Sequence, residues 1–503
     1  MKSLFGTTSC SCHLSIYLTM YIALSPSYAV RNESNGSFLI SVNKIINVRK
    51  DEFGAFSIPP FLGYILSHIG DLESEEAIKV IANDLGISSS AVKHFVDQLI
   101  ENPEHKEFKY SDTLSVVFPP MLLERCSEKP CANVYEEQSF DPKGEYNLNR
   151  PTAPLNANLM VTTKCSTDCL YCYANRKLQP LMDTDKLLDI IRELHDQGTI
   201  NVTLTGGDIL MHPDWQILLK RMRQYGYKPF LSTKTPLNRE QVRYLRELGY
   251  EEIQFSLDSA DPEVLKELIN VKDGYLDKVT SFLEYSAELN LNVLIRSVLT
   301  KKNASKERLS SLYDYLAAFD CVKEWVMTPA FFSQYKESYY KSLEADNDDL
   351  IWAFEFAHQD NWAFKVGLNK ITDKGYALKR FDTVEKYVCG NQICLANSTC
   401  ISILANGDCS VCEMLYDSPE YLLGNVYDSS IRDIWNSEKA LNLYAMAQES
   451  CPDSSPCKDC KVFDKCRNEF GKRICYVDIY KTGHSKWDPD PRCPHADIEN
   501  KML

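Results

Sequence analysis

The residues Thr162-Thr-Lys-Cys165-Ser-Thr-Asp-Cys169-Leu-Tyr-Cys172 place three cysteines on one short loop, at the spacing C-x3-C-x2-C. A strand pattern over residues 159–163 ends directly at this loop. Three thiolates this close together can bind three irons of a 4Fe–4S cubane and leave the fourth iron open. An open iron can chelate the amino and carboxylate groups of a methionine moiety. A structural zinc site is the alternative, but it needs a fourth protein ligand, and none is adjacent.

Strands and helices alternate downstream of this loop. Residues 183–197 are predicted as an amphipathic helix, because Leu187, Ile190, Ile191 and Leu194 share one face. The predicted strands are residues 159–163, 202–205, 229–233, 252–257, 293–299 and 324–327. Alternating βα units predict an α/β fold, a partial (β/α)6 TIM-like barrel over residues 155–330. The active site of such a sheet lies at the carboxyl ends of its strands.

Polar and glycine motifs follow these strands. After the second strand comes Thr205-Gly206-Gly207-Asp208, where two glycines would let the backbone approach a ligand closely. Ser232 closes the third strand, and the fourth ends in Ser256-Leu-Asp258. Arg296 on the fifth strand is a candidate partner for a carboxylate.

Together with the cysteine loop, these motifs resemble the radical S-adenosylmethionine (SAM) superfamily. The resemblance implies that Cys165, Cys169 and Cys172 hold a 4Fe–4S cluster that cleaves SAM to a 5′-deoxyadenosyl radical. The cofactor-binding residues that it implies are Tyr171, Gly206, Gly207, Asp208, Ser232, Ser256, Asp258 and Arg296. Two departures stand out: Asp208 replaces the family's Glu, and Ser232-Thr-Lys234 stands where relatives often carry Thr-Asn-Gly.

The cysteines from residue 389 onward resemble the SPASM domain, on the segments Cys394-x12-Gly407-x4-Cys412 and Cys457-x2-Cys460-x5-Cys466. That resemblance implies two auxiliary 4Fe–4S clusters. The first would be held by Cys389, Cys394, Cys412 and Cys475, and the second by Cys457, Cys460, Cys466 and Cys493. Eight residues separate Cys466 from Cys475 where the pattern has three, which an insertion would explain. Zinc is the competing ligand, and Cys400, Cys409 and Cys451 are expected to be buried side chains or neighbours of the clusters.

Residues 35–101 read as a small separate module. Strand patterns at residues 38–42, 45–48 and 55–58 precede three helical patterns, which is the outline of a winged helix (β3α3). Ser74 is expected to cap a helix that ends at Gly86, and Val92, Phe95, Val96 and Leu99 recur at helical spacing. Between residues 59 and 101 there are seven acidic side chains and two basic ones, a net charge of −5. This charge disfavours DNA and favours a peptide partner.

The remaining segments are assigned by composition. Residues 1–34 are interpreted as an N-terminal extension, in which the apolar stretch from Leu14 to Leu24 only faintly resembles a signal peptide. The proline-rich residues 102–154 are predicted to be a linker. Residues 331–388 are predicted to be a bridging helical region with aromatic core residues, and residues 389–503 the SPASM domain.

Overall composition narrows the class of protein. The chain has 503 residues, 44% of them hydrophobic, with a net charge of −15, which disfavours nucleic acid as a partner. No segment approaches the ~20 apolar residues of a membrane span. Its nineteen cysteines lie in clusters at short spacings, which favours metal or Fe–S ligation over disulfides.

The acidic N-terminal module resembles the precursor-recognition element of enzymes that modify ribosomally made peptides, which adds a leader peptide as an extra strand. The full resemblance implies a cytoplasmic maturase with three 4Fe–4S clusters and SAM, reduced by flavodoxin or ferredoxin. A precursor peptide bound through residues 35–101 would acquire a thioether, carbon–carbon or ether cross-link. The alternatives are a modifier of folded proteins (sulfatase-maturase-like), a cofactor-precursor synthase, and an Fe–S winged-helix regulator that binds DNA. No general acid or base is identified from the sequence.

Overall fold

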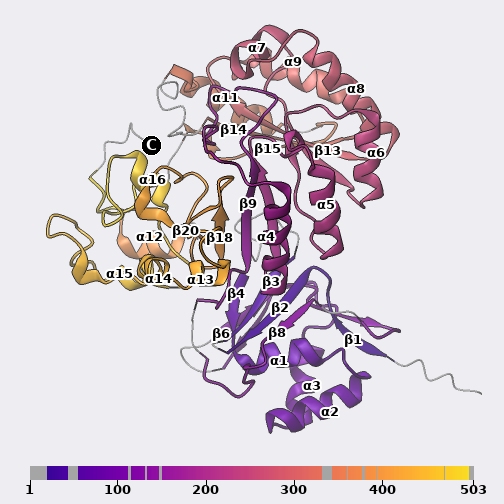
Figure 1. The fold of residues 1–503 in the computed structure, drawn as a ribbon, viewed down its shortest axis with the longest axis vertical. Coiled ribbons are helices and arrows are strands. Elements are labelled where there is room, and N and C mark those ends of the chain that lie inside the picture. Colours follow the sequence, from indigo (N-terminus) through magenta and orange to yellow (C-terminus); the bar gives the residue numbers. More distant parts are fainter. Residues whose placement is uncertain are drawn as a thin grey trace, which may run out of the picture. The chain divides into compact units, whose positions relative to one another are not determined.

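The computed structural model describes residues 20–34, 36–42, 55–110, 115–130, 133–146, 150–330, 342–359, 361–376, 380–391, 394–469 and 471–497. These residues form two compact units (Figure 1). The first unit lies within residues 20–41 and 56–146, and the second contains residues 150–497. Each unit is described by itself below.

The first unit combines short strands with three helices. Its strands are β1 (Tyr21–Leu24), β2 (Tyr28–Glu33), β3 (Gly36–Ser41), β4 (Ala55–Ile58), β5 (Lys106–Lys109), β6 (Ser115–Phe118), β7 (Leu123–Cys126) and β8 (Val134–Glu136). Its helices are α1 (Pro60–His68), α2 (Ser74–Leu85) and α3 (Ser89–Asp97). One sheet has the order β4-β3-β2-β8, while β1 pairs with β7 and β5 with β6. The predicted strand at 45–48 lies outside the described residues.

The helices of this unit follow their sequence signals closely. Gly86 ends α2 in the left-handed conformation, with φ of +71°, and Val92, Phe95, Val96 and Leu99 are buried. The expected cap of α2 is wrong by one residue. Glu73 is the N-cap residue, and the Ser74 hydroxyl instead donates to the carbonyl of Met20 at 2.6 Å.

Two boundaries of this unit differ from the prediction. The described part of residues 1–34 is not an extension, because β2 pairs with β3 over six residues and buries both strands. Residues 102–154 are not merely a linker, since they supply β5 to β8. These strands were missed because they are only three or four residues long, and because β7 and β8 pair with the distant strands β1 and β2.

The second unit is built on parallel strands, and all six predicted strands are present. They are β9 (Asn156–Thr162), β10 (Asn201–Gly206), β11 (Ser232–Thr233), β12 (Glu252–Ser256), β13 (Asn292–Leu299) and β14 (Val322–Pro329). Strands β9 and β10 pair in parallel, as do β11 to β14 in sequence order. The short helix η1 (Ile209–Met211) contacts both β10 and β11. This is the expected α/β fold of parallel strands and helices.

Amphipathic helices cover the outer face of these strands (Figure 1). They are α4 (Thr184–Asp196), α5 (Trp215–Gln224), α6 (Arg239–Glu247), α7 (Pro262–Ile269), α8 (Tyr275–Glu288) and α9 (Lys306–Ala317). The predicted helix at residues 183–197 is confirmed: Asp183 caps α4, and Leu187, Ile190, Ile191 and Leu194 are buried. Burial of such an apolar face is the main source of helix stability in a folded protein.

The described part of the bridging region holds more than helix. Its elements are α11 (Asn347–Ala357), β15 (Lys365–Leu368), β16 (Ile371–Thr372), β17 (Gly375–Tyr376) and α12 (Val384–Gly390). Strand β15 extends the main sheet beside β14. The aromatic residues pack as predicted, with Phe356 and Phe364 buried in the main core and Trp352, Phe354 and Trp362 packed against it.

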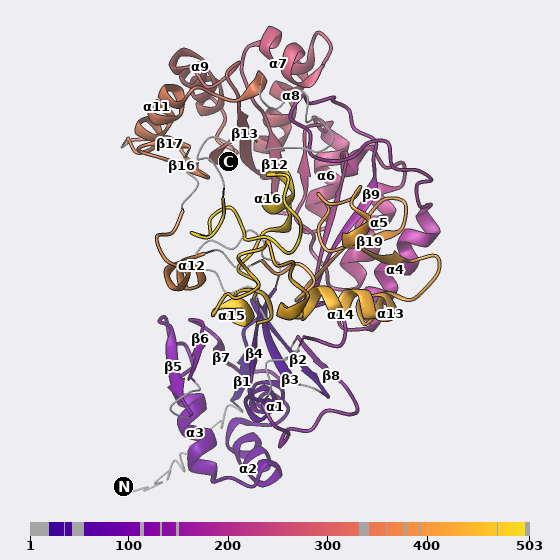
Figure 2. The ribbon, with the colours of Figure 1, turned by 90° about the vertical axis from the view of Figure 1, so that its left-hand side faces the viewer.

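The C-terminal region joins the other large sheet of this unit, the one that contains β9 and β10. Its elements are β18 (Cys400–Ile403), β19 (Asp408–Ser410), η2 (Pro419–Tyr421), β20 (Leu422–Asn425), α13 (Ile431–Trp435), α14 (Glu438–Tyr444), η3 (Gln448–Ser450), α15 (Phe463–Arg467) and α16 (Tyr476–Lys481). Figure 2 shows these elements in orange and yellow. Strand β18 pairs in parallel with β9, so one sheet has the order β10-β9-β18-β19-β20. Among the described residues, no helix has both the length and the apolar character needed to span a membrane.

Candidate functional site

The three-cysteine loop begins where β9 ends and is held by backbone contacts to α7. The amides of Asp168 and Leu170 donate to the carbonyls of Ile269 and Leu268, each at 2.9 Å. Arg176 donates to the carbonyl of Thr167 at 2.6 Å. The loop therefore has a fixed conformation before any ligand is considered.

Two of the three sulfur atoms of the loop lie beside one hydroxyl, while that of Cys172 lies 3.7 Å from the carbonyl of Ala174. The Thr167 oxygen lies 3.3 Å from the sulfur of Cys165 and 3.4 Å from that of Cys169. Burial raises the pKa of the Cys169 thiol to about 11, and the charge of Lys234 opposes that rise. Iron binding would deprotonate such a thiol. Two sulfurs on one short loop fit a cubane, in which each cysteine binds a different iron.

Single metal ions need a tighter arrangement of ligands. Within the described ranges, no three His, Cys, Asp or Glu side chains converge on a point that one metal ion could occupy.

Gly206 and Gly207 let β10 approach the chain that leads into the loop. The amide of Gly207 donates to the carbonyl of Thr162, and that of Asp208 donates to the carbonyl of Lys164, both at 2.8 Å. A Cβ atom would stand 2.3 Å from the Thr162 carbonyl oxygen at Gly206, and 2.3 Å from that of Lys164 at Gly207. The two glycines are therefore required for contact between two backbones, just before Cys165.

Asp208 lies at this strand end, where its carboxylate is already engaged by the protein. One oxygen accepts from the hydroxyls of Thr233 at 2.7 Å and Thr235 at 2.8 Å, and from the amide of Lys234. The other oxygen accepts from the amide of Leu210. Thr235 also lies 2.8 Å from the hydroxyl of Ser166. Asp208 thus ties the β11 end and the cysteine loop together.

Asp258 is the centre of a buried network at the end of β12. It is 1% exposed, and one of its oxygens accepts from the amide of Val298 at 2.9 Å. The other oxygen accepts from Lys234 at 2.8 Å and from the hydroxyl of Tyr171. Burial disfavours the charge of Lys234, but Asp258 raises the pKa of this amine on balance. Burial, and then Asp258, also hold the pKa of Tyr171 well above its usual range.

The other three predicted contacts lie on adjacent strands. Ser232 and Ser256 are linked by Gln254, whose amide donates to them at 2.7 and 3.3 Å. Arg296 stands directly opposite Ser256 in the β12–β13 register. Its guanidinium donates to Glu324 at 2.6 Å, so one edge of this side chain is occupied by a protein carboxylate.

We expect Asp258→Asn to destabilise the folded protein strongly. Asparagine has nearly the same shape but leaves the buried Lys234 ammonium without its anionic partner, a loss of ~3–5 kcal/mol. Asp97→Asn is the matched control, because the Lys93–Asp97 pair is exposed and such pairs contribute ~0.2–1 kcal/mol. Thermal unfolding of both variants measures the difference. Equal midpoints for the two variants would contradict the assigned role of Asp258.

Several site residues were not found from the sequence. Lys234 was noted only as a departure, and Tyr275, whose hydroxyl donates to the Lys234 carbonyl at 2.8 Å, carries no motif. Glu413 follows Cys412 and accepts from Tyr173, the residue after Cys172, at 3.1 Å. Burial raises the pKa of Glu413. This contact links the cysteine loop to the C-terminal region, and only the fold brings the two residues together.

The first predicted C-terminal cysteine set is partly assembled. Burial raises the pKa of Cys394, Cys412 and Cys475, and charge on Cys394 would raise the pKa values of the other two further, so Cys394 lies close enough to each of them for their charges to interact. The residues between Cys466 and Cys475 include Lys472, whose backbone exchanges two hydrogen bonds with Cys394. Cys389 is exposed in the last turn of α12.

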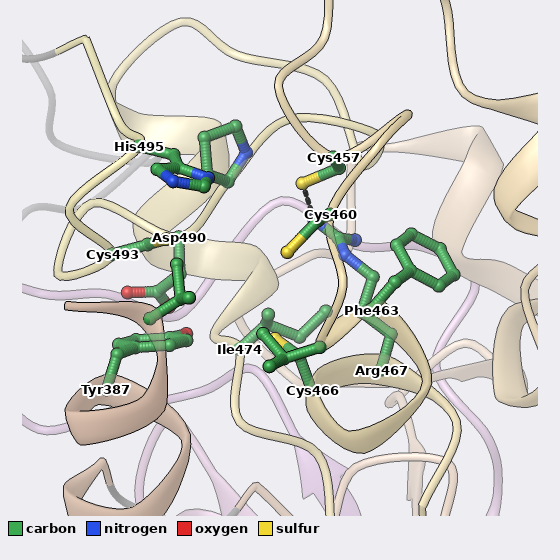
Figure 3. Close-up of a pocket in the computed structure, with 13 residues that line it drawn as sticks. Tyr387, Cys457, Cys460, Phe463, Cys466, Arg467, Ile474, Asp490, Cys493 and His495 are labelled. Atoms are coloured by element: carbon green, nitrogen blue, oxygen red, sulfur yellow. Dashed lines mark hydrogen bonds between the residues drawn. The ribbon is translucent and has the colours of Figure 1, made fainter.

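The second predicted set lines one pocket (Figure 3). Cys457, Cys460, Cys466 and Cys493 all border a space of about 370 Å³, part of which is open to solvent. The lining is otherwise largely apolar, with Val384, Tyr387, Val462, Phe463, Ile474 and Pro489, and it also holds Arg467, Asp490 and His495. Four sulfurs around one pocket are a donor set that fits a cubane. Cys400, Cys409 and Cys451 are buried, as predicted.

Asp490 connects the two sets. Its carboxylate lines the pocket of Cys493 and also accepts from the amide of Cys475 at 2.8 Å. Arg492 donates to the same carboxylate at 2.6 and 2.7 Å, so this buried acid is paired with a cation.

Comparison with protein families gives two matches. Residues 159–310 match the Radical SAM superfamily, and residues 394–461 match the SPASM iron–sulfur cluster-binding domain. The first match contains Cys165, Cys169 and Cys172. The second begins at Cys394 and includes Cys457 and Cys460.

Curated relatives are similar to part of the chain. The GTP 3′,8-cyclase of Nautilia profundicola is 24% identical over 241 residues, which is 46% of this chain and 70% of that protein. The corresponding enzyme of Campylobacter jejuni is 27% identical over 164 residues, 31% of this chain and 50% of that protein. A probable GTP 3′,8-cyclase of Methanococcus maripaludis is 25% identical, over 31% of this chain and 53% of that protein.

Solved structures are similar over nearly the whole chain. Streptococcus suis SuiB bound to its precursor peptide SuiA has a TM-score of 0.62 and 17% identity, covering 94% of this chain and 99% of SuiB. SuiB bound to S-adenosylmethionine has a TM-score of 0.58 and 16% identity over the same shares. This likeness concerns the fold, and it agrees with the two domain matches. The protein is a radical SAM enzyme that carries a C-terminal SPASM domain.

Proposed function

We propose that the enzyme is a peptide maturase that installs a cross-link in a ribosomally synthesised precursor peptide. The observation that carries this proposal is the fold shared with SuiB over 94% of the chain, which includes most of the N-terminal unit as well as the Radical SAM and SPASM domains. The structure of SuiB contains its precursor peptide SuiA. The cyclase alignments cover 46% of the chain or less.

The SAM site is proposed to use the residues at the strand ends. Cys165, Cys169 and Cys172 would hold the 4Fe–4S cluster, and with SAM it supplies a 5′-deoxyadenosyl radical that abstracts hydrogen from the peptide. The Asp258 network would fix Tyr171 and the loop beneath SAM. Arg296 and Ser256, which face each other across β12 and β13, would contact its polar groups.

The C-terminal cysteines are proposed to hold two auxiliary 4Fe–4S clusters. The pocket of Cys457, Cys460, Cys466 and Cys493 supports the second cluster. For the first, the proximity of Cys394, Cys412 and Cys475 supports three ligands, and Cys389 would complete the set. After hydrogen abstraction the peptide must lose one electron and one proton to close its cross-link, and an auxiliary cluster would take up the electron.

The N-terminal unit is proposed to bind the precursor through residues 35–101. Its small sheet ends at β4 on one side and at β8 on the other. A peptide added as a strand gains main-chain hydrogen bonds. Helix α2 carries Glu75 and Glu76 in its first turn, which favours a basic leader. Flavodoxin or ferredoxin is the proposed reductant, and the cytoplasm the proposed compartment.

Anaerobic reconstitution with a candidate precursor peptide tests this function. We expect about twelve iron atoms per chain for three cubanes. Turnover with SAM and dithionite should give 5′-deoxyadenosine and a peptide lighter by two hydrogens in mass spectrometry. Deoxyadenosine with an unchanged mass for every peptide offered would refute the maturase assignment. About four irons would refute the auxiliary clusters while leaving the SAM site intact.

A nucleotide cyclase is the second candidate, because the curated relatives are GTP 3′,8-cyclases. Incubation of the reconstituted enzyme with GTP and SAM distinguishes the two. A cyclised nucleotide in the absence of peptide would favour the cyclase. We expect GTP to be recovered unchanged.

A further inference from the structure

Arg467 occupies an unusual position beside the second cysteine set. It follows Cys466 at the end of α15 and is 1% exposed. Its guanidinium lies against one sulfur of the pocket, with Nη2 3.6 Å from the sulfur of Cys457 (Figure 3). The side chain is therefore a buried cation at the wall of a four-cysteine pocket.

The protein compensates this cation only in part. Nη1 donates to the carbonyl of Lys486 at 2.6 Å, and Nη2 donates to the carbonyl of Asp488. Within the described residues, Nε has no hydrogen-bond partner, and no carboxylate forms an ion pair with the guanidinium. Asp490, the acidic residue of the same pocket, is paired with Arg492. A buried charge without a counter-ion is costly, so the pocket calls for an anionic occupant.

A cubane bound by four thiolates meets that need, since it is anionic in both of its oxidation states. The reduced state carries one more negative charge than the oxidised state. A cation in contact with the cysteine sulfur therefore stabilises the reduced state more, and hydrogen bonds to sulfur act in the same direction. The low dielectric of a buried site strengthens both effects.

The first cysteine set has a different electrostatic environment. Arg492 is one cation near Cys475 and Cys394, and it is paired with Asp490 at 2.6 Å and with Asp478 at 3.2 Å. Lys472 also lies near Cys394, and Lys370 near Cys475. The charge of Arg492 is neutralised by two carboxylates, whereas that of Arg467 is not. Of these two arginines, Arg467 is therefore the one whose charge no carboxylate of the described residues neutralises.

We propose that Arg467 raises the reduction potential of the cluster bound by Cys457, Cys460, Cys466 and Cys493, so that this cluster is the electron acceptor of the pair. The cluster accepts an electron in the last step of cross-linking, in which the peptide radical loses one electron and one proton as the new bond forms. The cluster gains that electron and later passes it to an oxidised flavodoxin or ferredoxin. The inference rests on the proposed auxiliary clusters, but not on which bond the enzyme forms.

Redox titration of the holoenzyme, monitored by electron paramagnetic resonance, tests this role. In Arg467→Met, which keeps the volume but loses the charge, we expect the ratio of reduced to oxidised cluster at a fixed potential to fall tenfold. For a one-electron couple this is a shift of ~59 mV. Arg467→Lys keeps the charge and should shift the ratio less.

Arg150→Lys is the matched control. Arg150 is also a buried arginine that donates to carbonyls, those of Asn397 at 2.8 Å and Trp435 at 2.7 Å. All cluster potentials should be unchanged in it. A full iron content in Arg467→Met with unchanged potentials would overturn the proposal.

A second measurement needs no variant. In the wild-type holoenzyme labelled with [15N]arginine, pulsed paramagnetic resonance should detect nitrogen coupled to a reduced auxiliary cluster, and the absence of coupling would overturn the proposal. Failure of the underlying function is separately visible. If metal analysis finds no iron beyond the SAM cluster, the auxiliary clusters themselves are refuted.

Discussion

Cys169→Ala is expected to reduce the formation of 5′-deoxyadenosine to the level seen without enzyme. Cys169 is the most buried of the three loop cysteines, and its sulfur shares the Thr167 hydroxyl with Cys165. Two remaining thiolates cannot hold a cubane with one open iron in a fixed position. Iron should also fall by about four atoms per chain, while any auxiliary clusters remain.

The matched control is Cys321→Ala. Cys321 is also buried, but its thiol donates to the Leu283 carbonyl at 3.3 Å, far in sequence from every cysteine set. This variant should keep full iron and full production of 5′-deoxyadenosine. Normal SAM cleavage by Cys169→Ala would show that the loop is not the SAM cluster site.

Gly207→Ala is expected to lower the formation of 5′-deoxyadenosine through a displacement of the backbone alone. Its new Cβ would stand 2.3 Å from the Lys164 carbonyl oxygen and 2.6 Å from that of Thr163. Both atoms belong to main chain, so the strand end must move, and with it the start of the cysteine loop. Overpacking of this kind typically lowers the free energy of unfolding by ~1–3 kcal/mol. We expect a value at the upper end of this range, because main-chain atoms cannot move aside as easily as a flexible side chain. We expect a lower unfolding midpoint and an incompletely loaded SAM cluster.

Gly367→Ala provides the comparison for this variant. A Cβ at Gly367 would meet its nearest neighbour, a methyl of Val326, at 3.5 Å, which is an ordinary contact. Iron content and the unfolding midpoint should stay at wild-type values. If Gly207→Ala behaves like Gly367→Ala, the close approach of the two backbones does not constrain the loop.

Local patterns predicted what depends on local physics. The apolar face of α4 was readable from spacing, because helix periodicity involves residues three or four apart. The six strands could be placed for a similar reason, since buried parallel strands form short apolar runs between helices. The strand-end motifs then indicated where a site would lie.

The pairing of strands that are far apart in the chain could not be predicted from the sequence. Nothing in residues 400–403 indicates that β18 lies parallel to β9, more than two hundred positions away. The same holds for β7 with β1, and residues 123–126 were therefore assigned to a linker. Short strands have little periodicity of their own, and their partners are chosen by tertiary packing.

Side-chain roles were also only partly predictable. Asp208 was expected at the cofactor, but its carboxylate accepts hydrogen bonds from Thr233 and Thr235. The role of Gly207 was expected in ligand approach, whereas its close neighbour is the Lys164 backbone. Arg467 was overlooked because a basic residue next to a cysteine has no spacing signal. Its meaning depends on burial and on missing counter-ions.

The pairing of β18 with β9 has a consequence for how such enzymes diversify. Because one sheet and one apolar core run through both domains, the cluster-bearing half is not an interchangeable attachment. A domain taken from another enzyme would have to supply a strand that pairs with the edge of β9. Without such a strand, the edge of β9 would be unpaired and could associate with another copy of the chain. Recombination at this junction is therefore constrained. If the N-terminal unit binds the precursor as proposed, new substrates are more readily acquired by changes in that unit, which is compact by itself.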